Sequence, residues 1–170
     1  MFDTCVLGVD PGVARCGVAA VVRRDRRTDL TWAGTIHTAR DATDAERLRT
    51  IANGMRDAIA RFAPASVAIE RVAWNRNQVS ALQVARATGV LMAVSAEAGL
   101  EVQEYSPSEV KSAVTGAGNA TKEQVADALR RLHGLRNVPS EPDAADAVAV
   151  AVTHLVGAAF RSAAARAGAP

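Results

Sequence analysis

Two aspartates near the carboxyl end of the chain introduce charge into a segment that otherwise reads as a core helix. Residues 141–154 read EPDAADAVAVAVTH, so Asp143 and Asp146 precede an apolar run typical of a buried helix. A spacing of three residues places both carboxylates on one helix face. One interpretation is structural, with Asp143 as the helix cap and Asp146 near the positive end of the helix dipole. The other is a divalent metal site, which needs oxygen ligands from further elements.

Two more acids stand at the ends of short apolar segments that the sequence predicts to be strands. TCVLGVD (4–10) ends at Asp10, and SVAIE (66–70) ends at Glu70. If these strands are neighbours with their carboxyl ends together, both acids lie at the edge where open α/β sheets place their sites. With the helix pair they would form a self-repelling cluster of carboxylates. Two Mg²⁺ ions would offset that charge and supply both halves of a phosphodiester hydrolysis.

The segments around these acids predict a mixed α/β sheet with helices on its faces. The predicted strands are residues 4–10, 16–24, 30–38, 66–70 and 100–105. Capping boxes predict helices that open at Thr43, Ser106 and Thr121, the last of them ending at Gly134, and a small-residue helix is predicted over 78–97. Residues 1–157 are predicted to form one domain, and the alanine-rich residues 158–170 a frayed C-terminal tail.

Composition limits the class of protein. The 170 residues fit one domain, and 49% hydrophobic with 22% charged residues is ordinary for a soluble globular protein. The sequence has no apolar run long enough to span a membrane and no signal-peptide pattern at its start, so we expect a cytoplasmic protein without membrane association. A net charge of +2 is compatible with nucleic-acid binding but does not argue for it. No Ser–His or Cys–His arrangement suggests a protein nucleophile.

Lysine is rare in this chain, and its two occurrences are close together. Eighteen of the 20 basic residues are arginine, and the lysines are Lys111 and Lys122. Lys122 is predicted to lie in a first helical turn, where the helix dipole disfavours a cation. Because it follows the flexible GAGNA segment, it could reach out to a phosphate. The alternative is a solvated surface lysine.

Taken together, these motifs resemble the RuvC family of bacterial Holliday-junction resolvases, which have an RNase H-like fold. The resemblance rests on GVDPGVARCGVA, AIERV, NRNQVSALQVARATGV, YSPSEVKSAVTGAGNATKEQV and PDAADAVAVAVTH, in that order along nearly the whole chain. It implies a metal-dependent endonuclease that makes paired, symmetric cuts in four-way DNA junctions during recombination and repair. The family's acidic positions fall on Asp10, Glu70, Asp143 and Asp146, and its lysines near the scissile phosphate on Lys111 and Lys122. Some family members have histidine at the position of Asp143.

The resemblance also implies cofactors and partners. We expect two Mg²⁺ ions per active site, with Mn²⁺ also supporting cutting. The helix over residues 78–97 is expected to form a homodimer interface, because symmetric cutting needs two active sites related by a two-fold axis. The RuvA–RuvB branch-migration complex is the expected protein partner.

The loop ERVAWNRNQ (70–78) is a candidate DNA contact. Trp74 stands among polar residues directly after Glu70, and aromatic side chains in such loops can stack on unpaired bases. The DNA-binding residues predicted here are Trp74, Asn75, Arg76 and Asn77. The family usually has its aromatic residue one position earlier, at Ala73, so packing of Trp74 as a lid over the helix end is the alternative.

Three other functions remain open on the sequence alone. The segment DPGVARCG (10–17) resembles a phosphate loop of actin-like sugar kinases or ATPases, but 170 residues leave no room for their second lobe. A catalytically silent junction-binding relative would bind junctions without cutting them. Another RNase H-like nuclease would prefer a different substrate, such as an RNA–DNA hybrid.

Overall fold

The fold is a five-stranded sheet with five helices, seen in a computed structural model that describes residues 3–25, 27–71 and 78–166. The strands are β1 (Thr4–Asp10), β2 (Arg15–Arg24), β3 (Arg27–His37), β4 (Ser66–Glu70) and β5 (Glu101–Tyr105). The helices are α1 (Asp44–Phe62), α2 (Gln78–Glu97), α3 (Pro107–Thr115), α4 (Lys122–Arg131) and α5 (Pro142–Arg166).

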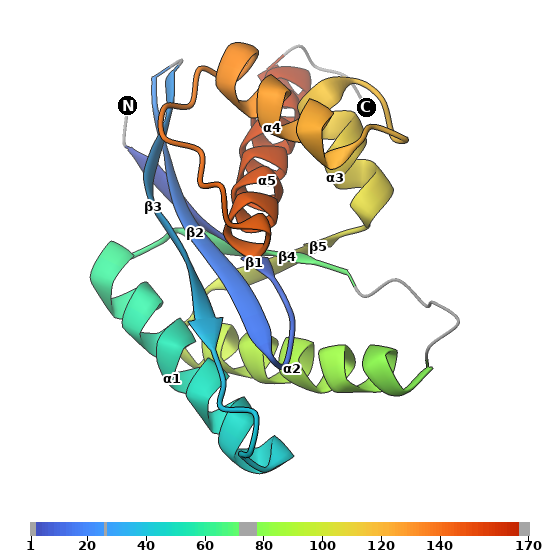
Figure 1. Ribbon diagram of the computed structural model, residues 1–170. Helices are drawn as coiled ribbons and strands as arrows, with labels where there is room; N and C mark the ends of the chain where they lie inside the picture. Colours follow the sequence, from blue (N-terminus) through green and yellow to red (C-terminus); the bar gives the residue numbers. More distant parts are fainter. Residues whose placement is uncertain (1–2, 26, 72–77, 167–170) are drawn as a thin grey trace.

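The sheet is mixed, as predicted. Its strand order is β3-β2-β1-β4-β5, with β1, β2 and β3 antiparallel and with β4 parallel to both β1 and β5. The three antiparallel strands follow one another in the chain, and the parallel strands are joined through helices (Figure 1). β1 therefore lies at the centre, buried from Val6 to Val9, and carries its last residue to the sheet edge.

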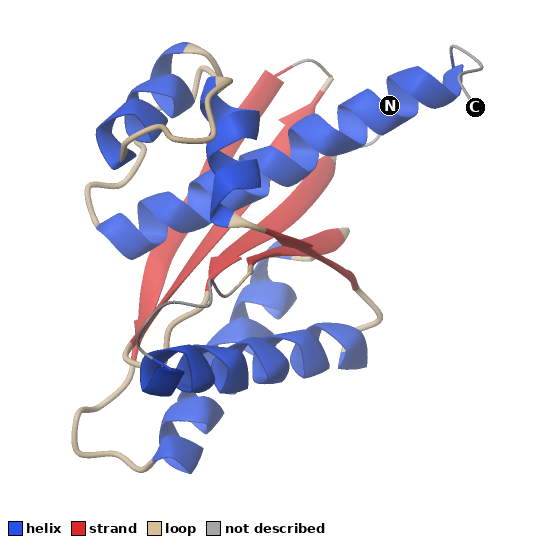
Figure 2. Cartoon of the chain, turned by 90° about the vertical axis from the view of Figure 1, so that its right-hand side faces the viewer, coloured by secondary structure: helices blue, strands red, loops and turns tan. Residues whose placement is uncertain are grey.

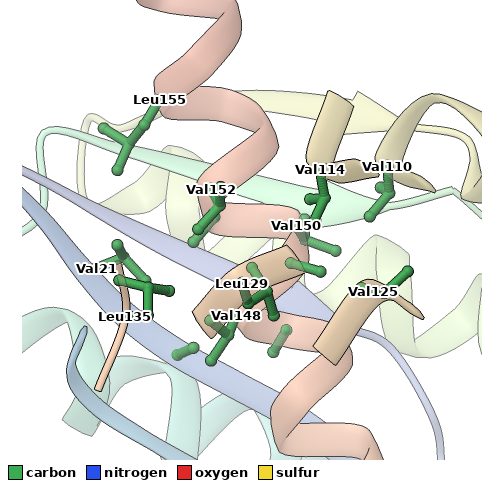
Figure 3. Close-up of a cluster of buried hydrophobic side chains, with 14 of the residues drawn as sticks. Val21, Val110, Val114, Val125, Leu129, Leu135, Val148, Val150, Val152 and Leu155 are labelled. Carbon is green, nitrogen blue, oxygen red and sulfur yellow. The ribbon is translucent and has the colours of Figure 1, made fainter. Parts of the chain in front are cut away.

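Helices cover both faces of the sheet. α1 and α2 lie on one face, and α3, α4 and α5 lie on the other (Figures 1 and 2). Each face has its own apolar core. Residues such as Leu7, Ile51 and Leu91 fill the core beneath α1 and α2. The other core joins Val6 and Val148 to the α3 and α4 side chains that Figure 3 shows.

Local sequence signals explain where three of the helices begin. The capping boxes predicted from sequence are present at α1, α3 and α4, where Thr43, Ser106 and Thr121 each accept a hydrogen bond from the backbone N–H three residues on. Pro107 occupies the first turn of α3, where its missing N–H costs nothing. These caps fix where α3 and α4 begin, and so where Lys111 and Lys122 lie on them.

Some element boundaries differ from the prediction. β3 begins at Arg27 and not at residue 30, because the chain reverses tightly at Asp25, which has a positive φ of 53°. α4 ends at Arg131, three residues before Gly134. α5 continues through residue 158 to Arg166, so the secondary structure does not change at the predicted domain end. The division into a domain and a tail stays a prediction.

Among the described residues, no helix combines the length and the apolar character needed to cross a membrane.

Candidate active site

The strand topology brings two of the predicted acids to one edge of the sheet. β1 and β4 are parallel neighbours, with Val9 paired to Ile69. Their next residues, Asp10 and Glu70, therefore leave the sheet side by side at its carboxyl edge. Both side chains are only partly exposed. The arrangement agrees with the prediction that these strands meet with their carboxyl ends together.

Helix α5 carries the other two acids to the same edge because glycines let it lie close to the sheet. α5 packs against β1 and β2, and a Cβ added to Gly8 would lie 2.6 Å from the backbone nitrogen of Ala151. A Cβ added to Gly17 would lie 2.5 Å from the carbonyl carbon of Asp143. Real Cβ atoms essentially never approach so closely. The first turn of α5 thus rests directly on the β2 backbone, next to the end of β1.

The four carboxylates lie close enough together for their charges to affect the pKa values of Asp10 and Glu70. The pKa of Asp10 is raised to about 7, mainly by burial and also by the negative charges of Glu70, Asp146 and Asp143. Burial also raises the pKa of Glu70, and Asp146 adds to the effect. Ionising these carboxylates in the folded protein therefore costs free energy, and a bound cation would lower that cost.

We predict that Asp10→Asn stabilises the protein in EDTA. Asp10 has a pKa of about 7 in the folded chain and about 3.8 as a reference, so its ionisation destabilises the fold. This cost is fully present above pH 7 and absent below about pH 3.8. At pH 8 the variant should gain about 1–3 kcal/mol, or roughly 5 °C in Tm. The gain should shrink as the pH falls towards 4.

Thermal unfolding followed between pH 4 and pH 8 measures this effect. Asp57→Asn, at an exposed position of α1, is the control and should leave Tm unchanged across the range. An Asp10→Asn variant that is less stable than wild type at pH 8 would contradict the prediction.

Lysine side chains from α3 and α4 complete this edge. The Nζ atom of Lys122 donates a hydrogen bond to Oδ2 of Asp146 over 2.6 Å, and that bond raises the pKa of the lysine. Lys111 is close enough for its charge to oppose the rise in the pKa of Glu70. The Lys122 side chain is 67% exposed, so it stands between the carboxylates and solvent.

Asp143 does not cap its helix. α5 begins at Pro142, so Asp143 lies inside the first turn, and its Oδ2 is a buried oxygen without a hydrogen bond. The Nε atom of Arg15, at the start of β2, lies 3.0 Å from that oxygen. Arg15 was not predicted from the sequence as a site residue, because its partner Asp143 lies far along the chain.

The side chains present fit a divalent metal ion. All four acids offer the hard oxygen ligands that Mg²⁺ prefers, and Oδ2 of Asp143 is a buried acceptor without a hydrogen-bond donor. As they stand, no three potential ligands within the described part of the chain converge closely enough to hold an ion. Two of the acids, Asp143 and Asp146, are instead engaged by Arg15 and Lys122.

The predicted DNA-contacting residues Trp74, Asn75, Arg76 and Asn77 lie outside the described residues. The segment follows β4 and precedes α2, so it connects to the carboxyl edge that carries Glu70.

Comparisons with known proteins agree with this geometry. The family described as "Crossover junction endodeoxyribonuclease RuvC" matches residues 6–154. RuvC of Leifsonia xyli is 44% identical over 150 residues, which are 88% of this chain and 72% of that protein. RuvC of Heliobacterium modesticaldum is 42% identical over 147 residues, which are 86% of this chain and 91% of that protein.

Solved structures show the same likeness. Thermus thermophilus RuvC in complex with Holliday junction substrate has a TM-score of 0.86 and 32% identity, covering 92% of this chain and 96% of that one. The yeast mitochondrial Holliday junction resolvase Ydc2 has a TM-score of 0.72 over 92% of this chain and 79% of its own, at 15% identity, and so shares the fold alone. The mixed sheet with its helices is the RNase H-like fold expected from the sequence.

Proposed function

This chain belongs to the RuvC family of crossover junction endodeoxyribonucleases, and from that premise we propose that it resolves four-way DNA junctions by paired, symmetric hydrolysis of phosphodiester bonds. One observation carries the proposal beyond family membership. Four carboxylates from two strands and one helix interact electrostatically at a single sheet edge, with Lys122 beside them. Such a cluster suits a metal-assisted nuclease of recombination and repair.

Asp10, Glu70, Asp143 and Asp146 are the residues that would hold the metal. We propose two Mg²⁺ ions per site, with Mn²⁺ also able to support cutting. Bound there, the ions would activate the attacking water and stabilise the leaving 3′ oxygen. The four acids would bind and orient the ions, and the paired strands hold Asp10 and Glu70 at neighbouring strand ends.

Lys122 and Lys111 would act on the DNA. Lys122 is largely exposed and lies at the carboxylate cluster, so its ammonium group can contact a phosphate placed there. Lys111 lies on the side of the cluster nearer Glu70. Both would partly neutralise the phosphate that approaches a negatively charged site.

We predict that Lys122→Ala slows cutting more than it weakens junction binding. One phosphate contact is a small part of a footprint of many phosphates, so affinity should fall only about two- to five-fold. The single-turnover rate should fall by about 10²-fold, because a charge beside the reacting phosphate is lost. Lys122→Arg should recover part of the rate. Affinity that fell by orders of magnitude, with a normal cutting rate, would make Lys122 a docking residue.

Trp74, Asn75, Arg76 and Asn77 are proposed to contact DNA. The support is their place in the chain, in the segment between the end of β4 at Glu70 and the start of α2 at Gln78. Opening of base pairs at the crossover costs a few kcal/mol, and stacking a base on an aromatic ring returns about 1–3 kcal/mol. We therefore propose Trp74 as the residue that stacks on an opened base.

A homodimer through α2 would supply the two active sites. On α2, Leu82 is 54% exposed and Met92 is 37% exposed, so a second copy of the chain could bury both side chains. A two-fold axis through this face would relate two identical sites, as symmetric cutting requires. From the family resemblance we also propose the RuvA–RuvB complex as a partner and the cytoplasm as the location.

A cleavage assay on a synthetic four-way junction tests the proposed function. In Mg²⁺ we expect paired nicks at symmetric positions, with 5′-phosphate and 3′-hydroxyl ends, and no cutting in EDTA. A linear duplex of the same sequence should stay intact. Junction binding without cutting in either Mg²⁺ or Mn²⁺ would identify a catalytically silent relative, and preferred cutting of an RNA–DNA hybrid would identify another RNase H-like nuclease.

A further inference from the structure

Arg15 is placed at the carboxylate cluster by the geometry of β2. It stands two residues before Gly17, and alternate residues of a strand point to the same face. Gly17 lies directly beneath the backbone of Asp143, so the face that Arg15 shares with it is the face that carries α5. The Arg15 side chain therefore reaches Asp143 from a fixed position at the start of the strand.

The contact between Arg15 and Asp143 is electrostatic and weak. The Nε atom lies 3.0 Å from Oδ2, yet this buried oxygen accepts no hydrogen bond, so the N–H does not point at it. The Arg15 side chain is 62% exposed, whereas that of Asp143 is 20% exposed. A guanidinium held this way is attracted to the carboxylate but remains largely in solvent, so another cation can displace it at little cost.

The second acid of α5 also faces a basic side chain, through a hydrogen-bonded ion pair. Lys122 forms its ion pair with Asp146, and Lys122 is also largely exposed. Both helix acids thus face a protein cation, and within the described residues no three ligands converge on a metal position. A metal ion that binds Asp143 through Oδ2 competes with Arg15 for that oxygen.

We propose that Arg15 holds Asp143 while the site contains no metal ion, and turns to the phosphate backbone of the junction once an ion replaces it. The inference rests on the proposed function, since it requires metal binding by the same acids. It adds a residue to the site with two successive roles. The first is to offset the charge of Asp143, and the second is to contact DNA through a guanidinium group, which suits phosphate well.

Metal binding without DNA separates this inference from the proposed function. Mn²⁺ titrated into the protein by calorimetry should bind Arg15→Ala about three-fold more tightly than wild type, because a competing cation is gone. Arg15→Lys should bind Mn²⁺ as wild type does. If wild type itself binds no Mn²⁺, the proposed function fails. If wild type binds Mn²⁺ and Arg15→Ala binds Mn²⁺ equally or less tightly, Arg15 does not compete with the metal ion for Asp143.

Cutting at saturating Mg²⁺ tests the second role. Arg15→Ala should cut the junction about ten-fold more slowly in single turnover, although it binds metal more tightly, because a charged contact to phosphate is lost. Arg15→Lys should retain most of the rate. Unchanged or faster cutting by Arg15→Ala would overturn the proposed phosphate contact.

A matched control lies on the same strand. Arg24 pairs its Nε atom with Oδ2 of Asp3 over the same 3.0 Å, and its side chain is 60% exposed. It stands at the far end of β2, away from the acids. Arg24→Ala removes an equivalent charge and should change neither Mn²⁺ affinity nor cutting. Equal effects of Arg24→Ala and Arg15→Ala would show that net charge alone acts, and would overturn the inference.

Discussion

Asp146→Asn and Glu70→Gln should each lower the rate of junction cutting by roughly three orders of magnitude while junction affinity stays near wild type. Each substitution keeps the size of the side chain and removes one negative charge from the cluster. The ion pair of Asp146 with Lys122 and the raised pKa of Glu70 place both residues in the shared field of the site. Loss of either charge weakens the capture of divalent ions.

Affinity should survive because DNA is attracted by lysine and arginine, not by carboxylates. Removal of an acid beside a phosphate site can only reduce repulsion. Gel-shift titration in EDTA measures affinity, and single-turnover cutting in Mg²⁺ measures the rate. Asp127→Asn, on the same helix as Lys122 but paired with Arg131, serves as the control and should cut normally. An Asp146→Asn variant that cuts at nearly the wild-type rate would contradict the four-carboxylate site.

The sequence was informative where local signals decide the structure. β1, β4 and α2 have the predicted bounds, and the capping residues Thr43 and Thr121 begin their helices as expected. Acids at strand ends could be assigned to one sheet edge, because parallel neighbouring strands end together. These features depend on residues close in sequence or on general rules of sheet topology.

Contacts between residues far apart in the sequence could not be predicted. The pairing of Arg15 with Asp143 joins residues far apart in the sequence, and neither residue type nor spacing indicates it. The same holds for Gly8 and Gly17, whose lack of a side chain matters only because α5 lies on them. A glycine in a strand reads as a bulge or a close approach, but the sequence does not say to what.

Gly17→Ala should destabilise the protein and impair cutting together. The added Cβ would lie 2.5 Å from the carbonyl carbon of Asp143, and a backbone atom in a packed helix cannot move aside without moving the helix. Overpacking of this kind costs about 1–3 kcal/mol in the free energy of unfolding. The shift falls on the start of α5, where Asp143 lies in the first turn and Asp146 follows it. A displacement of about 1 Å can cost about 10²-fold in rate.

Substitutions at two further glycines test whether the clash with α5 causes these effects. Gly8→Ala also forces α5 from the sheet, at the backbone of Ala147 and Ala151. Because Ala147 follows Asp146 directly, this substitution should likewise cost stability and impair cutting. Gly89 on α2 has open space around its missing Cβ, so Gly89→Ala should leave the free energy of unfolding unchanged or raise it by roughly 0.5–1 kcal/mol. Urea unfolding and single-turnover cutting should show that Gly17→Ala and Gly8→Ala are impaired in both properties and that Gly89→Ala is impaired in neither. If Gly17→Ala cuts normally at a temperature where it is fully folded, the acids do not depend on the close seating of α5 on β2.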